Sequence, residues 1–178
     1  MTKLTNFLLV ALTALALVPA GVARNTTKLS DVRIVATQGG QTFTHADAGV
    51  KFDVPQGWKA KPDGEVITVS SADDSLQVIF WVPDEDSFDA AVKELDKELS
   101  KTVKNMKTVG KPAKDELNGM PHYGETGTGE VEGATIVWSV DVLGAKKPLI
   151  ILTFAAPNLF EKNSKGFENL LSSIKKVG

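Results

Sequence analysis

Few side chains in this sequence have the types and spacing that acid–base or metal chemistry needs. The chain of 178 residues contains two histidines, His45 and His122, and no cysteine. Each histidine stands beside a strand-like run, and the two do not form a ligand spacing such as His-x-x-x-His, so we predict no metal site. The lack of cysteine excludes disulfides, thiolate nucleophiles and a lipid-modified cysteine. We therefore expect both histidines to be structural.

Two further motifs resemble ligand-binding loops but lack their defining residues. Residues 84–89 (DEDSFD) gather acids as a calcium loop does, yet the glycine at the sixth position and the distal glutamate are missing. Helix capping is the better interpretation. Residues 124–129 (GETGTG) are rich in glycine, but a strand follows them where a phosphate-binding loop needs a helix. Neither motif predicts a cofactor.

Acid-based catalysis is harder to judge from sequence. No Gly-x-Ser-x-Gly motif indicates a nucleophilic serine. Two carboxylates that meet in the folded chain could still hydrolyse glycosidic bonds, because such pairs need no fixed spacing. A carboxylate-dependent secreted hydrolase therefore stays an alternative to a non-catalytic protein.

The element that organises the chain is a pair of runs at residues 134–143 and 149–156. Both are rich in β-branched and aromatic residues, which is typical of an antiparallel hairpin, and the second is apolar on both faces, which predicts a central strand. A two-residue turn at 132–133 would join a preceding strand to this hairpin. The resulting cross-strand partners are Gly129 with Ile136, Gly127 with Trp138, Glu125 with Val140, and Tyr123 with Val142.

This register gives a candidate contact site. Trp138 would lie over Gly127 and form the wall of a shallow trough. Tyr123 and Glu125 would stand beside it on the apolar side of the sheet, where a carboxylate is costly unless it has a partner or an opening. We predict Tyr123, Glu125 and Trp138 as ligand or partner contacts, with no catalytic role. A slip of one residue would instead turn Glu125 outward.

The remaining elements predict an α+β fold. Strand-like runs occur in hairpins at residues 32–45, 50–54, 66–70 and 76–82, and apolar residues at helical spacing predict one helix over 88–106 and another from 157 onward. We expect a twisted antiparallel β-sheet flanked by these two main helices, an α/β/α sandwich. The predicted core contains Phe52, Trp58, Phe80, Leu95, Trp138, Ile151, Phe154 and Leu170.

The N-terminus predicts export. A lysine at position 3, an apolar run over 7–18 and small residues over 19–23 are typical of a signal peptide, with a cut after Ala23 or after Ala20. An uncleaved anchor is the alternative. We therefore divide the chain into a signal peptide at 1–23, a mobile segment at 24–41 and one α+β domain at 42–178. This organisation predicts a periplasmic or secreted protein that is peripheral to the envelope rather than membrane-spanning.

Composition argues against nucleic acid as a partner. The chain is 42% hydrophobic and 24% charged, with a net charge of -2, whereas a nucleic-acid binder carries a concentrated basic face. We expect a monomer that binds a protein or a small ligand.

The phrase GVKFDVPQGW at residues 49–58, with the hairpin, helix and aliphatic strand that follow, resembles the PsbP-like superfamily, and its bacterial envelope members such as DcrB-like proteins in particular. The likeness extends over most of residues 42–177. It implies an antiparallel sheet between helices and no cofactor. Relatives of this fold dock onto larger partners, but their roles do not transfer, because no partner-binding residue of theirs matches a position in this chain. We predict an exported, non-catalytic accessory module of the bacterial cell envelope.

Overall fold

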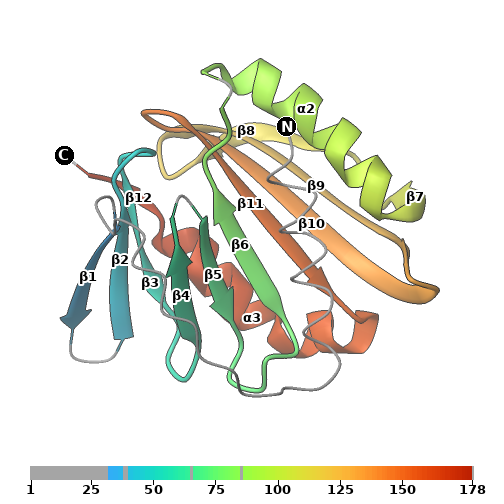
Figure 1. The fold of residues 1–178 in the computed structure, drawn as a ribbon, viewed down its shortest axis with the longest axis horizontal. Helices are drawn as coiled ribbons and strands as arrows, with labels where there is room; N and C mark the ends of the chain where they lie inside the picture. Colours follow the sequence, from blue (N-terminus) through green and yellow to red (C-terminus); the bar gives the residue numbers. More distant parts are fainter. Residues whose placement is uncertain (1–31, 38–39, 65, 85, 178) are drawn as a thin grey trace.

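The computed structural model describes residues 32–37, 40–64, 66–84 and 86–177 (Figure 1). The predicted signal peptide and both of its cut sites lie outside the described residues. The predicted hairpin at 32–45 is present, as β1 (Val32–Thr37) and β2 (Gly40–His45), so the domain boundary expected at residue 42 falls within β2.

The strands form two antiparallel sheets, where the sequence predicted one. The smaller sheet has the order β1-β2-β3-β12, with β3 at Val50–Val54 and β12 at Lys175–Lys176. The larger sheet has the order β4-β5-β6-β11-β10-β9-β7, and β8 also pairs with β9. Its strands are β4 (Lys59–Asp63), β5 (Val66–Ser70), β6 (Gln77–Trp81), β7 (Lys104–Thr108), β8 (Ala113–Leu117), β9 (Met120–Val131), β10 (Ala134–Gly144) and β11 (Pro148–Ala155). The predicted α+β class with antiparallel pairing is confirmed.

Two apolar cores lie on opposite faces of the larger sheet. Helix α2 (Phe88–Thr102) packs with Ile150 and Leu152 of β11, whereas α3 (Pro157–Ser173) and the smaller sheet pack with Leu149 and Ile151. Alternate residues of a strand point to opposite faces, so β11 is the doubly buried central strand that the sequence predicts. Figure 1 shows α2 and α3 on opposite sides of this sheet.

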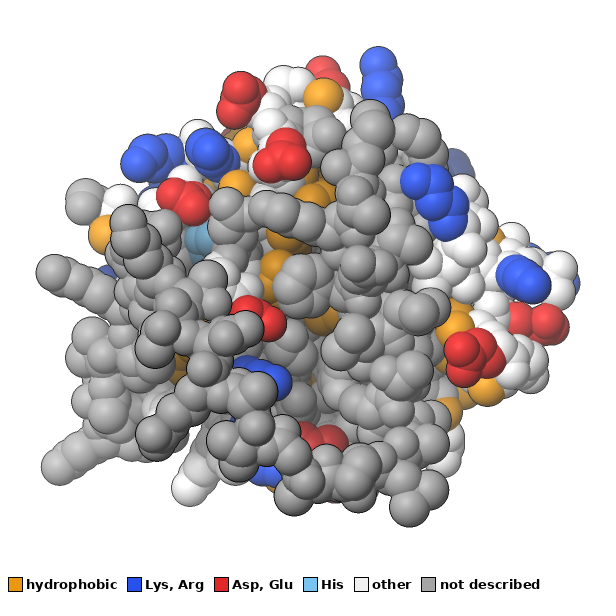
Figure 2. Space-filling view, viewed as in Figure 1, with side chains coloured by type: hydrophobic (Ala, Val, Ile, Leu, Met, Phe, Trp, Pro, Cys, Tyr) orange, Lys and Arg blue, Asp and Glu red, His pale blue; other side chains and the backbone are white. Residues whose placement is uncertain are grey.

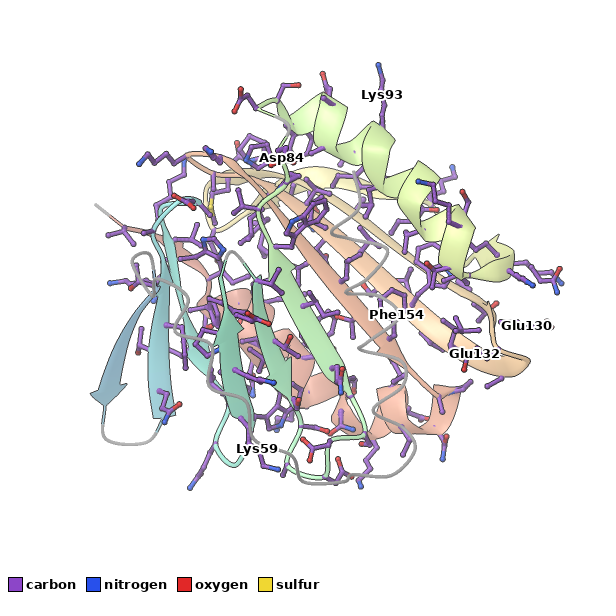
Figure 3. The ribbon with its side chains drawn as sticks, viewed as in Figure 1. Lys59, Asp84, Lys93, Glu130, Glu132 and Phe154 are labelled. Atoms are coloured by element: carbon purple, nitrogen blue, oxygen red, sulfur yellow. The ribbon has the colours of Figure 1, made fainter. Side chains whose placement is uncertain are left out.

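Most of the predicted core is buried. Phe52, Phe80, Leu95, Trp138, Ile151 and Leu170 are each at most 1% exposed. The prediction was wrong for Trp58 and Phe154, which are only partly buried. Trp58 lies against α3 because Gly166 leaves room for its indole: a Cβ at Gly166 would be 2.5 Å from Trp58 Cζ2. Phe154 lies on the sheet face that α2 partly covers (Figure 3).

Helix α2 ends earlier than the sequence predicts. Ser87 caps its start by accepting a hydrogen bond from Ala90 N–H, but the helix stops at Thr102 and the chain continues as β7. The apolar spacing that suggested a helix to residue 106 fits both structures, because Val103 packs over Gly129 of β9. The edge of β9 satisfies the backbone groups of β7, and Asn105 takes a φ of 52°, which a helix does not allow.

Helix α3 is fixed at both ends by side chains from loops. Asn118 Nδ2 donates to the carbonyls of Ser172 and Ile174, which closes the helix C-terminus. Lys162 Nζ lies 2.6 Å from Asp73, and this contact, with hydroxyl donors from the same loop, holds the pKa of the Asp73 carboxyl well below its usual range. No helix in the described part of the chain is long and apolar enough to cross a membrane.

Candidate functional site

The β9–β10 hairpin positions all three predicted contact residues. Glu132 and Gly133 form its turn with φ angles of 51° and 83°, the left-handed geometry that a two-residue hairpin turn requires. The neighbouring Glu130 and Glu132 mark this tip in Figure 3. The predicted register is confirmed, because Gly127 faces Trp138, Glu125 faces Val140 and Tyr123 faces Val142. The one-residue slip is therefore excluded.

The space over Gly127 is filled rather than open. A Cβ at Gly127 would lie 2.3 Å from Trp138 Cζ2 and 2.5 Å from the carbonyl oxygen of Lys107. The Trp138 indole is sealed in the α2 core at 1% exposure, and its Nε1–H donates to Thr128 O at 3.1 Å. The shallow trough with an aromatic wall was a wrong expectation, because the indole and β7 together close it. Trp138 is therefore a buried residue that stabilises the β9–β10 hairpin.

Tyr123 and Glu125 meet in a small polar cluster with Thr108 of β7. Tyr123 Oη–H donates to Glu125 Oε2 at 2.5 Å, and Thr108 Oγ1–H donates to Glu125 Oε1 at 2.5 Å. Two hydroxyl donors thus satisfy the half-buried carboxylate, which removes much of the cost of placing it beside apolar neighbours. We call Thr108, Tyr123 and Glu125 the Glu125 cluster.

An exposed apolar residue, Val109, follows Thr108 of this cluster in the chain. Val109 is 62% exposed, and its N–H donates to Thr126 O at 2.8 Å, so its backbone lies opposite Thr126, the residue next to Glu125 on β9. Two different strands pair with β9 along this edge. β8 pairs with residues 120–124 of β9, and β7 pairs with residues 127–130, so Glu125 lies between the two paired stretches. The Glu125 cluster therefore lies at a break in the sheet edge, and Val109 follows directly where β7 ends.

The opposite face of the same hairpin holds a site that sequence reasoning missed. His122 Nδ1 is 2.6 Å from Asp115 Oδ1, and His122 Nε2 is 3.0 Å from Asp141 Oδ1. Gly124 makes room for the ring, because a Cβ there would lie 2.9 Å from His122 Cε1. We call Asp115, His122 and Asp141 the His122 cluster. The predicted register already placed Gly124 opposite Asp141. Asp115 enters through pairing of β8 with β9 across the two-residue turn at Asn118 and Gly119, a hairpin signal in the sequence that also puts Asp115 opposite His122.

The His122 cluster is electrostatically distinctive. Its histidine and Asp141 side chains are 12% and 9% exposed, whereas that of Asp115 is 63% exposed. The hydrogen bond to Asp141 raises the pKa of His122 above its ordinary value, partial burial opposes this, and Asp115 adds to the rise. Ser139 Oγ–H donates to the second oxygen of Asp141 at 3.4 Å.

The pairing of His122 with two carboxylates limits the catalytic roles that it could have. Both ring nitrogens of His122 face carboxylates, so neither is aimed at the hydroxyl of Ser139. The imidazole fills the space between Asp115 and Asp141. Within the described ranges, no group of three or more histidine and acidic side chains is arranged to hold a metal ion.

Comparison with solved structures shows which proteins have a similar fold. The chain is similar to LpqN of Mycobacterium tuberculosis, described as involved in cell envelope biogenesis, with a TM-score of 0.55 and 12% sequence identity. The likeness covers 81% of this chain and 90% of LpqN. At this identity it establishes a shared fold alone.

Two weaker likenesses accompany it. A cyanobacterial PsbP protein, CyanoP of Synechocystis sp. PCC 6803, has a TM-score of 0.49 at 13% identity, over 87% of this chain and 98% of that one. PA94 of Pseudomonas aeruginosa, a protein of unknown function described as a putative regulator, has a TM-score of 0.47 at 10% identity, over 81% and 96%. No protein-family model and no curated protein matches the chain.

Proposed function

We propose that this protein is an exported, non-catalytic accessory module of the bacterial cell envelope, a monomer that docks onto a partner protein through the Glu125 cluster and Val109. The predicted signal peptide supports export to the periplasm or beyond. The likeness to LpqN, a protein involved in cell envelope biogenesis, supports an envelope role. Tyr123 and Glu125 keep their predicted contact role, and Trp138 acts by holding their strand in place.

The observation that carries this proposal is the carboxylate of Glu125, held by two hydroxyl groups at a break in the sheet edge where the exposed Val109 follows β7. A carboxylate fixed by two hydroxyls needs little reordering to accept a basic group from a partner, so less entropy is lost on binding. Val109, at 62% exposure, supplies apolar area that contact would remove from water. A fixed polar group and one exposed apolar residue at a sheet edge suit a small, transient protein contact.

The pairing of the acid and histidine side chains favours docking over hydrolysis. A glycosidase needs two carboxyl groups that face each other across room for substrate or water. In the His122 cluster the imidazole occupies that room, and in the Glu125 cluster the carboxylate is paired with hydroxyls. The carboxylate-dependent hydrolase is therefore the less well supported hypothesis.

Site-specific photo-crosslinking in the host tests the proposal. A photoreactive amino acid in place of Val109 is expected to form a discrete adduct with one envelope protein, identified by mass spectrometry. The same group at Gln56, an exposed turn residue between β3 and β4, is the matched control and should not form it. The adduct should fade when Glu125→Gln is added. Equal adducts at both positions, or an adduct indifferent to Glu125→Gln, would contradict docking at this surface.

A further inference from the structure

Lysines from three separate parts of the chain meet at one end of the molecule. Lys51 is on β3, Lys146 and Lys147 lie in the loop between β10 and β11, and Lys175 and Lys176 form β12. All of these side chains are exposed. We call this set the lysine end. Figure 2 shows basic side chains at the upper left, where the β10–β11 hairpin ends.

Backbone contacts at Gly49 bring the segments of the lysine end together. The N–H of Lys146 donates to Ala48 O at 3.0 Å, and the N–H of Val177 donates to Gly49 O at 2.9 Å. Gly49 has a φ of +63°, and a Cβ there would lie 3.1 Å from Lys146 Cβ. Glycine at this position therefore allows the close approach of the loop to the smaller sheet.

The lysine end carries more positive than negative charge, although the exposed Asp53 lies two residues from Lys51 on β3. Lys51 and Lys175 are direct cross-strand partners, an arrangement that destabilises a sheet when both side chains carry the same charge. None of these lysines forms an ion pair with another described residue. Asp47, in the turn before Gly49, adds one negative charge nearby in the chain. The net charge of -2 for the whole chain thus conceals a local excess of positive charge.

We propose that the lysine end binds the surface of an anionic phospholipid bilayer. Lysine ammonium groups are point charges on flexible stems, which suits dispersed headgroups better than a single planar anion. Val177 is 46% exposed directly after Lys176, so an apolar side chain accompanies the charges and can enter the headgroup region. Because the rest of the chain is acidic on balance, this attraction also orients the molecule with the lysine end toward the bilayer.

Vesicle binding by the mature protein recovered from its host tests this inference. The protein should co-sediment with vesicles that contain phosphatidylglycerol in phosphatidylcholine, less so as salt rises, and should not bind pure phosphatidylcholine vesicles. The variant Lys146→Gln/Lys147→Gln/Lys175→Gln is expected to bind about 100-fold more weakly, on the basis of about 1 kcal/mol for each lysine near an anionic surface. All proteins compared share one N-terminus, so any contribution from it cancels.

A matched control separates a site from general charge. Lys104→Gln/Lys107→Gln/Lys111→Gln removes the same charge from exposed positions on and just after β7, where Lys104 faces Glu130, and should retain most of the binding. Equal losses in both variants, or binding to duplex DNA or a soluble polyanion without binding to vesicles, would overturn the proposal. Unfolding midpoints at or above that of the wild type would confirm that both variants fold, and Lys175→Gln should if anything raise the midpoint, because it removes a like-charge pair with Lys51. The assay needs no protein partner, so this proposal and the docking proposal fail independently.

Discussion

On each face of β9 a glycine leaves room for a bulky side chain of the hairpin, but the side chain is apolar on one face and ionisable on the other. On the α2 face, Gly127 makes room for the neutral indole of Trp138, which is sealed from water. On the other face, Gly124 makes room for the His122–Asp141 pair, whose histidine gains a raised pKa. A glycine in a strand therefore indicates that a neighbouring side chain comes close, but it does not indicate which kind of side chain. The free energy of unfolding should therefore depend on side-chain volume at the face with the indole, and on pH at the face with the histidine.

The largest effect should come from filling the space over Gly127. In Gly127→Ala the new Cβ would meet both Trp138 and the backbone oxygen of Lys107, and a backbone atom cannot move aside as a flexible side chain can. We expect a loss of about 3 kcal/mol in the free energy of unfolding, measured with urea. A loss below about 1 kcal/mol would mean that the hairpin and β7 shift easily, and the contrast between the faces would be lost.

A double-mutant cycle sharpens this prediction. Trp138→Phe removes the ring atoms nearest to the new Cβ, so the double variant Gly127→Ala/Trp138→Phe should lose less stability than the two single losses added together. The contact with Lys107 O remains, so recovery is expected to be partial. Strict additivity would indicate that the backbone contact alone sets the cost.

The second effect is a pH dependence that comes from the other face. The folded-state pKa of His122 is raised, chiefly by Asp141, so the protonated ring stabilises the fold fully below the unfolded pKa of about 6.5. This contribution is lost as the pH rises through the folded pKa. Asp141→Asn should reduce stability by about 2 kcal/mol at pH values where His122 is charged, because a charged hydrogen bond between mostly buried groups is lost.

The control for this prediction is His122→Gln. In the wild type, the free energy of unfolding measured with urea should fall as the pH rises from about 6.5 through the folded pKa of His122. The His122→Gln variant should not show this fall. Gly127→Ala should keep it, because its effect is steric. A wild-type profile that matches His122→Gln would contradict the electrostatic account of this face.

The hairpin shows what sequence could predict and where other information was needed. The register of β9 on β10 followed from a two-residue turn, and it placed Tyr123 and Glu125 on the same face of the sheet as Trp138. The end of α2 did not follow, because the spacing of Val103 suits a helix and a strand equally, and pairing with β9 decided between them. Asp115 lies opposite His122 across the turn at Asn118 and Gly119, a local pattern from which this pair could have been predicted. The lysine end forms through contacts between segments distant in sequence, which no local pattern encodes.

The smallest effect on stability, with the largest effect on binding, is expected at the Glu125 cluster. Tyr123 is only 9% exposed and packs in the α2 core, so Tyr123→Ala would open a cavity and mix folding with docking. Tyr123→Phe with Glu125→Gln instead keeps both side-chain volumes and removes one hydroxyl and one charge. The unfolding free energy should fall by about 1 kcal/mol, the usual net worth of such hydrogen bonds. Crosslinking from Val109 should nevertheless be largely lost. If stability falls by several times that amount while the crosslink survives, the cluster is a structural brace, and contact with a partner must lie elsewhere.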